Sequence, residues 1–246
     1  MLVKSQVKYI QSLGHKKFRD AEGVFVAEGP RMVQELLHCE FTALVKAYAT
    51  RDWLLENASL IPDKNSITEV DQQELERISF LSAAVSVLAV FRKPVFPVMD
   101  KPEGITLLLD NIQDPGNLGT IIRTADWFGV RRIVCSPDTA DLFSPKVVQS
   151  TMGSITRVEV LYQDLTEYLD AHPGIPAYAA MLDGEDLEQL QRIPEGMILI
   201  GNESRGVRPE LAERAGRRIR IPGRGSAESL NVAVATGILL FMIQKS

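Results

Sequence analysis

Short apolar runs recur along the chain and alternate with longer segments whose apolar residues return every three or four positions. Short continuous runs are typical of buried strands, and the longer periodicity is typical of helices. The alternation predicts an α/β fold with a mainly parallel sheet that is covered on both faces. The predicted strands are 24–29, 43–49, 85–91, 105–110, 131–136, 157–161, 177–181, 197–201 and 218–221. The predicted helices are 30–38, 71–79, 117–129, 144–153 and a last one from near Glu228.

One segment interrupts this alternation. Residues 92–104, "RKPVFPVMDKPEG", contain three prolines within ten positions. Each proline disfavours helix and restricts the residue before it to extended forms. We therefore predict an N-terminal α/β domain over residues 1–95, a linker over 96–104, and a larger C-terminal α/β domain over 105–246.

Composition narrows the class of protein. The chain is 45% hydrophobic and 24% charged, which is ordinary for a soluble globular protein. No apolar segment approaches the roughly 18–20 residues that cross a bilayer, and the basic N-terminus lacks the apolar stretch of a signal peptide. The two cysteines and three histidines form no metal-ligand spacing. We expect a cytoplasmic protein that holds no metal and contacts no membrane.

Charge is unevenly distributed although the net charge is only −5. One basic cluster lies in the first twenty residues and another precedes the last predicted helix. Such clusters are either solvated faces or local sites for a phosphate backbone, since salt screens the distant negative charges. Their members are Lys4, Lys8, Lys16, Lys17 and Arg19, and Arg214, Arg217, Arg218, Arg220 and Arg224.

Three groups of polar residues follow apolar strands, at the edge where parallel sheets bind ligands. In the first, "DNIQDPGNLGTIIRTADWFG" (110–129), Pro115-Gly116 predicts a turn and Asn117 either caps a helix or faces a cleft. Arg123 interrupts an apolar segment, so it either reaches solvent or binds a phosphate. The second group is Gly201-Asn202-Glu203, which is either a plain turn or a site that orients a substrate group.

The third group, "IPGRGSAESLN" (221–231), first suggests a phosphate-binding loop. A dinucleotide fingerprint fails because Glu228 stands where the third glycine should be, and because no acidic residue follows about twenty positions on. A P-loop fails because no Gly-Lys-Ser/Thr is present. A helix cap would explain one serine of this segment, but not the gathering of Glu228, Ser229 and Asn231.

Together the three groups resemble the signature motifs of the SpoU/TrmH-type RNA ribose 2′-O-methyltransferases of the SPOUT superfamily. The resemblance covers residues 105–246 closely and the N-terminal domain more loosely. Gly223 departs from the family's usual bulky apolar residue, and Ser204-Arg205 separate Glu203 from its glycine. The matching residues are Asp114-Pro115, Asn117, Gly119 and 122–125, then 201–203 and Gly206, then Ile221-Pro222, Gly225, 229–232 and the small apolar run 233–238.

The resemblance implies a C-terminal domain with a trefoil knot and an N-terminal RNA-binding domain similar to certain ribosomal proteins. It implies S-adenosylmethionine as cofactor and methyl transfer to a ribose 2′-hydroxyl of rRNA or tRNA. The catalytic residues it implies are Arg123, Asn117, Glu203, Ser229 and Asn231. The cofactor-binding residues it implies are Gly201, Ile221, Leu230, Leu199, Ile200 and Gly225.

The resemblance also implies a homodimer. Residues 230–242 are apolar around nearly the whole helix, which predicts burial on all sides, either in a core or partly against a second subunit. The main alternative is a non-catalytic RNA-binding protein with the same fold. The failed glycine spacing argues against a nucleotide or NAD enzyme, and the motif set is that of the ribose branch rather than that of a base methyltransferase.

Overall fold

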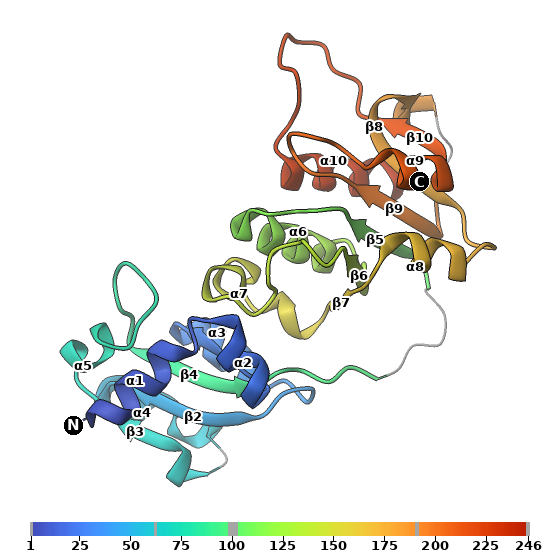
Figure 1. Cartoon of the computed structure of the whole chain (residues 1–246). Helices are drawn as coiled ribbons and strands as arrows, with labels where there is room; N and C mark the ends of the chain where they lie inside the picture. The colour runs from blue at the N-terminus through green and yellow to red at the C-terminus, as the bar shows by residue number, and fades with distance from the viewer. Residues whose placement is uncertain (1, 62, 98–102, 190–191, 245–246) are drawn as a thin grey trace. The chain divides into compact units, whose positions relative to one another are not determined.

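The computed structural model describes residues 2–61, 63–97, 103–189 and 192–244, which form two compact units (Figure 1). The first unit takes in Met1–Pro97 and Asp141–Thr156, and the second takes in Val98–Ala140 and Arg157–Ser246. The centre of the predicted linker, residues 98–102, lies outside the described residues. Residues 141–156, which the predicted boundaries assign to the C-terminal domain, are grouped with the first unit.

The first unit is built on a four-stranded sheet in the order β1-β4-β2-β3. Its strands are β1 (Val24–Glu28), β2 (Leu44–Ala49), β3 (Ile67–Glu69) and β4 (Val87–Arg92). β4 is antiparallel to β1 and β2, whereas β2 and β3 are parallel. Three of these strands were predicted, and the short β3 was not.

Helices surround this sheet, and most of them bury apolar side chains. They are α1 (Lys4–Ser12), α2 (Lys16–Glu22), α3 (Pro30–Leu37), α4 (Arg51–Asn57), α5 (Gln72–Glu76) and α7 (Pro145–Thr151). The one buried residue of α2 is Arg19. α3 starts with Pro30 in its first turn. Asp71 caps α5, since its carboxylate accepts the Glu74 N–H at 2.8 Å. α1, α2 and α4 were not predicted.

The segment 141–156 closes part of the core of the first unit. The ring of Phe143 lies 5.3 Å from the ring of Phe25 on β1. The ammonium of Lys93 lies 4.8 Å from the centre of the Phe143 ring. Arg19 is buried, donates to the Leu13 carbonyl at 2.5 Å and forms an ion pair with Asp141. Residues from the middle of the chain therefore complete the N-terminal unit.

The second unit contains a six-stranded sheet in the order β10-β8-β9-β5-β6-β7, in which every neighbouring pair is parallel. This confirms the predicted parallel sheet. The strands are β5 (Ile105–Leu109), β6 (Arg132–Cys135), β7 (Glu159–Tyr162), β8 (Ala177–Asp186), β9 (Gly196–Ile200) and β10 (Gly216–Arg220).

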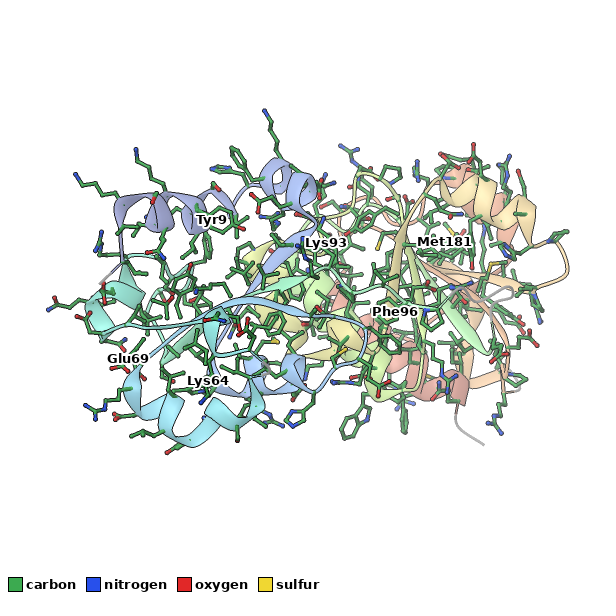
Figure 2. The ribbon with its side chains drawn as sticks, turned by 90° about the horizontal axis from the view of Figure 1, so that it is seen from below. Tyr9, Lys64, Glu69, Lys93, Phe96 and Met181 are labelled. Atoms are coloured by element: carbon green, nitrogen blue, oxygen red, sulfur yellow. The ribbon has the colours of Figure 1, made fainter. Side chains whose placement is uncertain are left out.

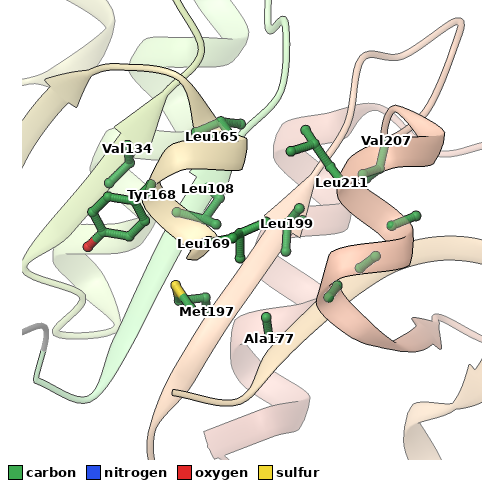
Figure 3. Packing of buried hydrophobic residues seen from close by; sticks show 13 residues of the cluster. Leu108, Val134, Leu165, Tyr168, Leu169, Ala177, Met197, Leu199, Val207 and Leu211 are labelled. Carbon is green, nitrogen blue, oxygen red and sulfur yellow. The ribbon is translucent and has the colours of Figure 1, made fainter. Parts of the chain in front are cut away.

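Helices α8 (Leu165–Ala171) and α9 (Pro209–Ala215) cover one face of this sheet, and neither was predicted. Their apolar side chains meet Leu108 of β5 and Leu199 of β9 in a buried cluster (Figure 3). Neighbouring residues on a strand point to opposite faces, so Leu107 and Leu109 are buried on the other side. Both faces of β5 are therefore buried, as its continuous apolar run predicted.

Helices α6 (Pro115–Trp127) and α10 (Val232–Gln244) lie together, with the Gln244 amide donating to the Phe128 carbonyl at 2.9 Å. α10 begins at Val232, so the prediction of a start near Glu228 was wrong. The prediction that this helix is buried on all sides is also wrong for one chain. Val234 is 53% exposed and Phe241 is 57% exposed, although the rest of the helix is mostly covered. An apolar side of α10 therefore faces outward.

None of the helices in the described ranges is long and apolar enough to cross a membrane.

Candidate functional site

The first motif places the side chain of Asn117 just inside the start of α6. The helix is capped by Asp114, whose carboxylate accepts the Asn117 N–H at 2.8 Å, and Pro115 occupies its first turn. Asn117 is therefore not the cap that its sequence position allowed. Its side-chain amide is free to bind groups outside the helix.

Asn117 joins the three motifs. Its Nδ2 donates to Glu203 Oε1 at 2.6 Å, and its Oδ1 accepts from Asn231 Nδ2 at 3.0 Å. Glu203 follows β9 and Asn231 precedes α10, so residues from three distant stretches meet at the carboxyl edge of the sheet. The structure thus brings together three of the five predicted catalytic residues.

The hydrogen bonds of this cluster have one possible direction. Asn231 Oδ1 accepts from the N–H groups of Ala233 and Val234, at 3.0 and 3.3 Å, and so caps α10. Asn231 must then donate through Nδ2, and Asn117 must accept through Oδ1 and donate through Nδ2. The carboxylate of Glu203 is the last acceptor in this series of hydrogen bonds. Its Oε2 accepts no hydrogen bond from the described residues. Glu203 is exposed, so that oxygen is open to a substrate.

A tight turn presents Glu203. Gly201 has no room for a side chain, because a Cβ atom there would lie 2.0 Å from the carbonyl carbon of Gly206. Asn202 closes the turn, since its carbonyl accepts the Gly206 N–H at 2.8 Å and its Oδ1 accepts the Ser204 N–H at 2.9 Å. The plain-turn interpretation of Gly201 and Asn202 is thus correct, and the turn also presents the acidic residue.

Two contacts that sequence reasoning missed hold this turn to the end of β5. Asn202 Nδ2 donates to the carbonyl of Asn111 at 2.9 Å. The buried carboxylate of Asp110 accepts two hydrogen bonds from Arg208, one from its backbone N–H at 2.9 Å and one from its side-chain Nε–H at 2.7 Å. Burial raises the pKa of Asp110, and the hydrogen bonds and charge of Arg208 oppose that rise. The sequence did offer one signal for this contact, because Asp110 is a lone acidic residue at the end of an apolar strand.

The third motif forms an exposed loop between β10 and α10. Leu230 is 46% exposed and Ile221 is half-buried, so apolar surface remains uncovered there. No atom lies within 4 Å of a Cβ placed on Gly223 or Gly225, which leaves open space beside the backbone. Ser229 is exposed in this loop and makes no hydrogen bond to the residues that the structure describes.

Two other predicted cofactor residues lie deeper. Leu199 and Ile200 are buried, and the side chain of Leu199 belongs to the core cluster under α8 and α9. Any ligand at the end of β9 would meet their backbone rather than the Leu199 side chain.

Arg123 does not join the Asn117 cluster. Six helical positions turn the chain through about 600°, so the two side chains point roughly 120° apart. Arg123 is exposed on the outer side of α6, close along the helix to Trp127, which is 85% exposed. Within the described residues it makes no hydrogen bond or ion pair. Among the described residues, Arg123 therefore makes no contact with Asn117, Glu203 or Asn231 through a hydrogen bond or ion pair.

Among the described residues, no three histidine, cysteine, aspartate or glutamate side chains are grouped so that they could hold a metal ion.

Comparison with known proteins identifies both parts of the chain. The SpoU rRNA Methylase family matches residues 104–241, and the MRM3-like substrate binding domain matches residues 4–89. The 23S rRNA (guanosine(2553)-2′-O)-methyltransferase RlmP of Bacillus subtilis is 31% identical, over 97% of this chain and 96% of that protein.

Solved structures agree. A Porphyromonas gingivalis protein assigned to the TrmH family of RNA methyltransferases is 38% identical, with a TM-score of 0.87 over 99% of this chain and 98% of that one. An AdoMet-bound rRNA methyltransferase from Sinorhizobium meliloti is 30% identical, with a TM-score of 0.85 over 99% and 95% of the two chains. The chain therefore belongs to the SpoU rRNA methylase family.

Proposed function

We propose that this protein transfers a methyl group from S-adenosylmethionine to a ribose 2′-hydroxyl of ribosomal RNA. The observation that carries the proposal is the Asn117–Glu203–Asn231 cluster, which gathers polar residues of all three motifs at one open edge. The rRNA substrates of the similar proteins named above support ribosomal RNA over tRNA.

The residues around the third motif fit this cofactor. An adenine ring needs apolar surface and close approach to backbone, which the uncovered Leu230 and Ile221 and the open space beside Gly225 offer. The backbone at Gly201 and Ile200 ends β9 at the same edge of the sheet. The AdoMet-bound structure of a protein 30% identical to this chain supports the assignment.

The bound cofactor supplies a methyl group on a sulfonium that a nucleophile can displace. The oxygen–carbon bond forms as the carbon–sulfur bond breaks, the hydroxyl proton leaves, and S-adenosylhomocysteine is released. The protein must hold the hydroxyl in line with the breaking bond, and positioning of this kind is a large contribution to rate. Glu203 Oε2 is the acceptor that can hold this hydroxyl and receive its proton. Asn117 and Asn231 fix that carboxylate, and Ser229, two positions before Asn231, offers an exposed hydroxyl to the substrate.

Arg123 has a different role. A guanidinium does not deprotonate near neutral pH, so it cannot act as a base. On the outer side of α6 it is placed to bind the phosphate next to the target ribose and to stabilise negative charge on the oxygen. Its distance from the Asn117 cluster along the helix surface favours a contact with the site of a second subunit.

A homodimer supplies that subunit. Val234 and Phe241 of α10 and Trp127 of α6 are large exposed apolar residues on two helices that lie together. Large exposed apolar residues on adjoining helices are typical of an interface. We expect α6 and α10 to pack against the same helices of a second copy, and light scattering at working concentration tests whether the protein is a dimer.

The first unit completes the proposal as the RNA-binding part, in keeping with its match to a substrate binding domain. The division into 1–95, 96–104 and 105–246 remains our proposed functional division. The trefoil knot stays a prediction from the resemblance.

The test combines binding with product analysis. Purified protein, S-adenosylmethionine and unmodified 23S rRNA transcript should give one 2′-O-methyl nucleoside by mass spectrometry. Calorimetry should show binding of S-adenosylhomocysteine and none of NAD. Cofactor binding without any methylated nucleoside from rRNA or tRNA would instead favour the non-catalytic RNA-binding alternative.

The role of Arg123 is tested separately. Arg123→Ala should keep cofactor binding and lose most methylation, whereas Arg123→Lys should restore part of it because a positive charge remains. Normal methylation by Arg123→Ala would remove its role.

A further inference from the structure

The two basic clusters of the sequence differ in what surrounds them. Four of the five arginines in the cluster before α10 face acidic residues, most of them on the neighbouring β8, whereas Arg224 is exposed and forms no ion pair within the described residues. Arg217, Arg218 and Arg220 lie 3.5, 2.6 and 3.9 Å from the carboxylates of Glu185, Asp183 and Asp186, and Arg214 lies 3.2 Å from that of Asp170. These arginines are therefore largely neutralised within the fold.

Four lysines of the first unit have no such ion-pair partners. Lys4 and Lys8 on α1 and Lys16 and Lys17 on α2 are exposed, and none forms an ion pair within the described part of the chain. The first acidic residue of the sequence is Asp20. We call these four residues the lysine surface.

The acidic residues that follow the lysines in the sequence bind other groups. Asp20 pairs with Lys93 at 2.5 Å, and Glu22 accepts the Tyr9 hydroxyl at 2.6 Å. The hydrogen bond to Lys93 lowers the pKa of Asp20, and the nearby charge of Lys16 lowers it further. Asp20 therefore opposes part of the charge of Lys16, but within the described residues neither Asp20 nor Glu22 forms an ion pair with any of the four lysines.

The helices under the lysines are held in place. Val7 and Ile10 of α1 are buried in the core of the first unit. The bond from Tyr9 to Glu22 ties α1 to α2, and the two helices lie next to each other along one border of the unit (Figure 2). Lys4 and Lys8 are four positions apart, so they occupy one face of α1.

An aromatic side chain accompanies this charge. Phe18 follows Lys17, is 44% exposed, and its ring lies 6.4 Å from that of His15. Exposed aromatic rings beside basic groups are how proteins bind unpaired bases of RNA. A membrane surface fits less well, because the apolar face of α1 is buried in the core and not available for lipid.

We propose that the lysine surface of α1 and α2 is where RNA docks on the first unit, with its phosphates on the four lysines and an unpaired base on Phe18. That the partner is RNA rests on the proposed function. The inference goes beyond that function by excluding the β10 arginines from phosphate binding and by naming the residues that bind.

The test measures RNA affinity against salt for the full chain and a quadruple Lys→Gln variant of the lysine surface. Fluorescently labelled fragments that tile a 23S rRNA transcript serve as the probe. Removal of four phosphate contacts should lower affinity at least tenfold at physiological salt and reduce the slope of log affinity against log salt by about 3. The matched control replaces Arg214, Arg217, Arg218 and Arg220 by glutamine and should leave both quantities unchanged within twofold.

Phe18→Ala tests the stacking contact. It should weaken binding about tenfold without changing the salt slope, because stacking is not ionic. Phe18→Tyr should restore binding. Thermal melts and circular dichroism confirm that every variant remains folded.

The possible results separate this inference from the proposed function. Unchanged RNA affinity in the Lys→Gln variant, a loss confined to the arginine control, or equally tight lysine-dependent binding of polyglutamate or anionic vesicles would each overturn the docking surface. Lysine-dependent RNA binding by a protein that methylates no RNA would support the docking surface and overturn the proposed function.

Discussion

Each unit of the molecule contains a cluster of polar side chains, and the two clusters differ in exposure. In the first unit Arg19 is 2% exposed, and its side chain binds Asp141 and the Leu13 carbonyl. In the second unit Glu203 and Asn231 are exposed and bind each other only through Asn117. A buried charge must be paired because it has lost its water, whereas an exposed group loses little if its partner is removed. The buried pair therefore serves stability, and the exposed cluster is free to serve a reaction.

The largest expected effect concerns the turn that carries the exposed cluster. Gly201→Ala would place a Cβ atom 2.0 Å from the backbone of Gly206, and no flexible side chain can give way there. We expect a loss of more than about 4 kcal/mol in the free energy of unfolding, which is the range of severe backbone and packing defects. Urea denaturation measures it.

Gly225→Ala is the matched control for that change. The space beside Gly225 is open, so the unfolding free energy should stay within about 0.5 kcal/mol of the parent. Similar stabilities for the two variants would contradict the close approach at Gly201.

The buried pair gives the next largest effect. Asp141→Ala would leave the Arg19 guanidinium buried without its carboxylate, and Asp141 is itself one-fifth exposed. We expect a loss of about 3 kcal/mol, at the lower end for a broken buried pair. Chemical denaturation followed by circular dichroism would show it.

Asp20→Ala provides the comparison within the same unit. The Asp20–Lys93 pair is exposed, with Asp20 48% accessible, so its loss should lower the unfolding free energy by less than about 1 kcal/mol. If Asp20→Ala lowered the unfolding free energy as much as Asp141→Ala, exposure would not explain why buried and exposed polar groups contribute differently to stability.

The exposed cluster should show the opposite behaviour. Glu203→Gln keeps the shape of the side chain, so stability should change by less than about 0.5 kcal/mol. The rate of methylation should fall about 30- to 100-fold, because an amide cannot receive the hydroxyl proton. Glu213→Gln, on the exposed side of α9, should change neither quantity. A stable Glu203→Gln enzyme with full activity would assign the proton to another group.

Much of the fold could be predicted because it depends on local patterns. The run 105–110 reads as a buried strand, Gly129 stops α6 with a φ of 71°, and Asp71 caps α5. The six parallel strands follow from the alternation of such elements. α8 and α9 are only two turns long, and their apolar positions become a stripe only once the sheet beneath them is known.

The sequence could predict which residues belong to the candidate site, but not how they are arranged. The motif resemblance selected Asn117, Glu203 and Asn231, which do meet. It also selected Arg123, which forms no hydrogen bond or ion pair with these three residues within the described chain. Pairings across the fold, such as Asp110 with Arg208, carry no local signal because the two residues are 98 positions apart. The neutralisation of the β10 arginines is likewise invisible until β8 is placed beside them.

A further pair of variants separates the two roles of one residue. Asn231 caps α10 through Oδ1 and holds Asn117 through Nδ2. Asn231→Ala removes both contacts and should lower the unfolding free energy by about 1 kcal/mol, as loss of a helix cap does. Asn231→Asp keeps the cap and replaces only the donor, so it should retain the parent's stability and still lose methylation activity. Equal activity of Asn231→Asp and the parent would show that the exposed cluster needs no fixed direction of hydrogen bonding, and Asn231 would then belong with Arg19 and Asp141 as a residue of the fold.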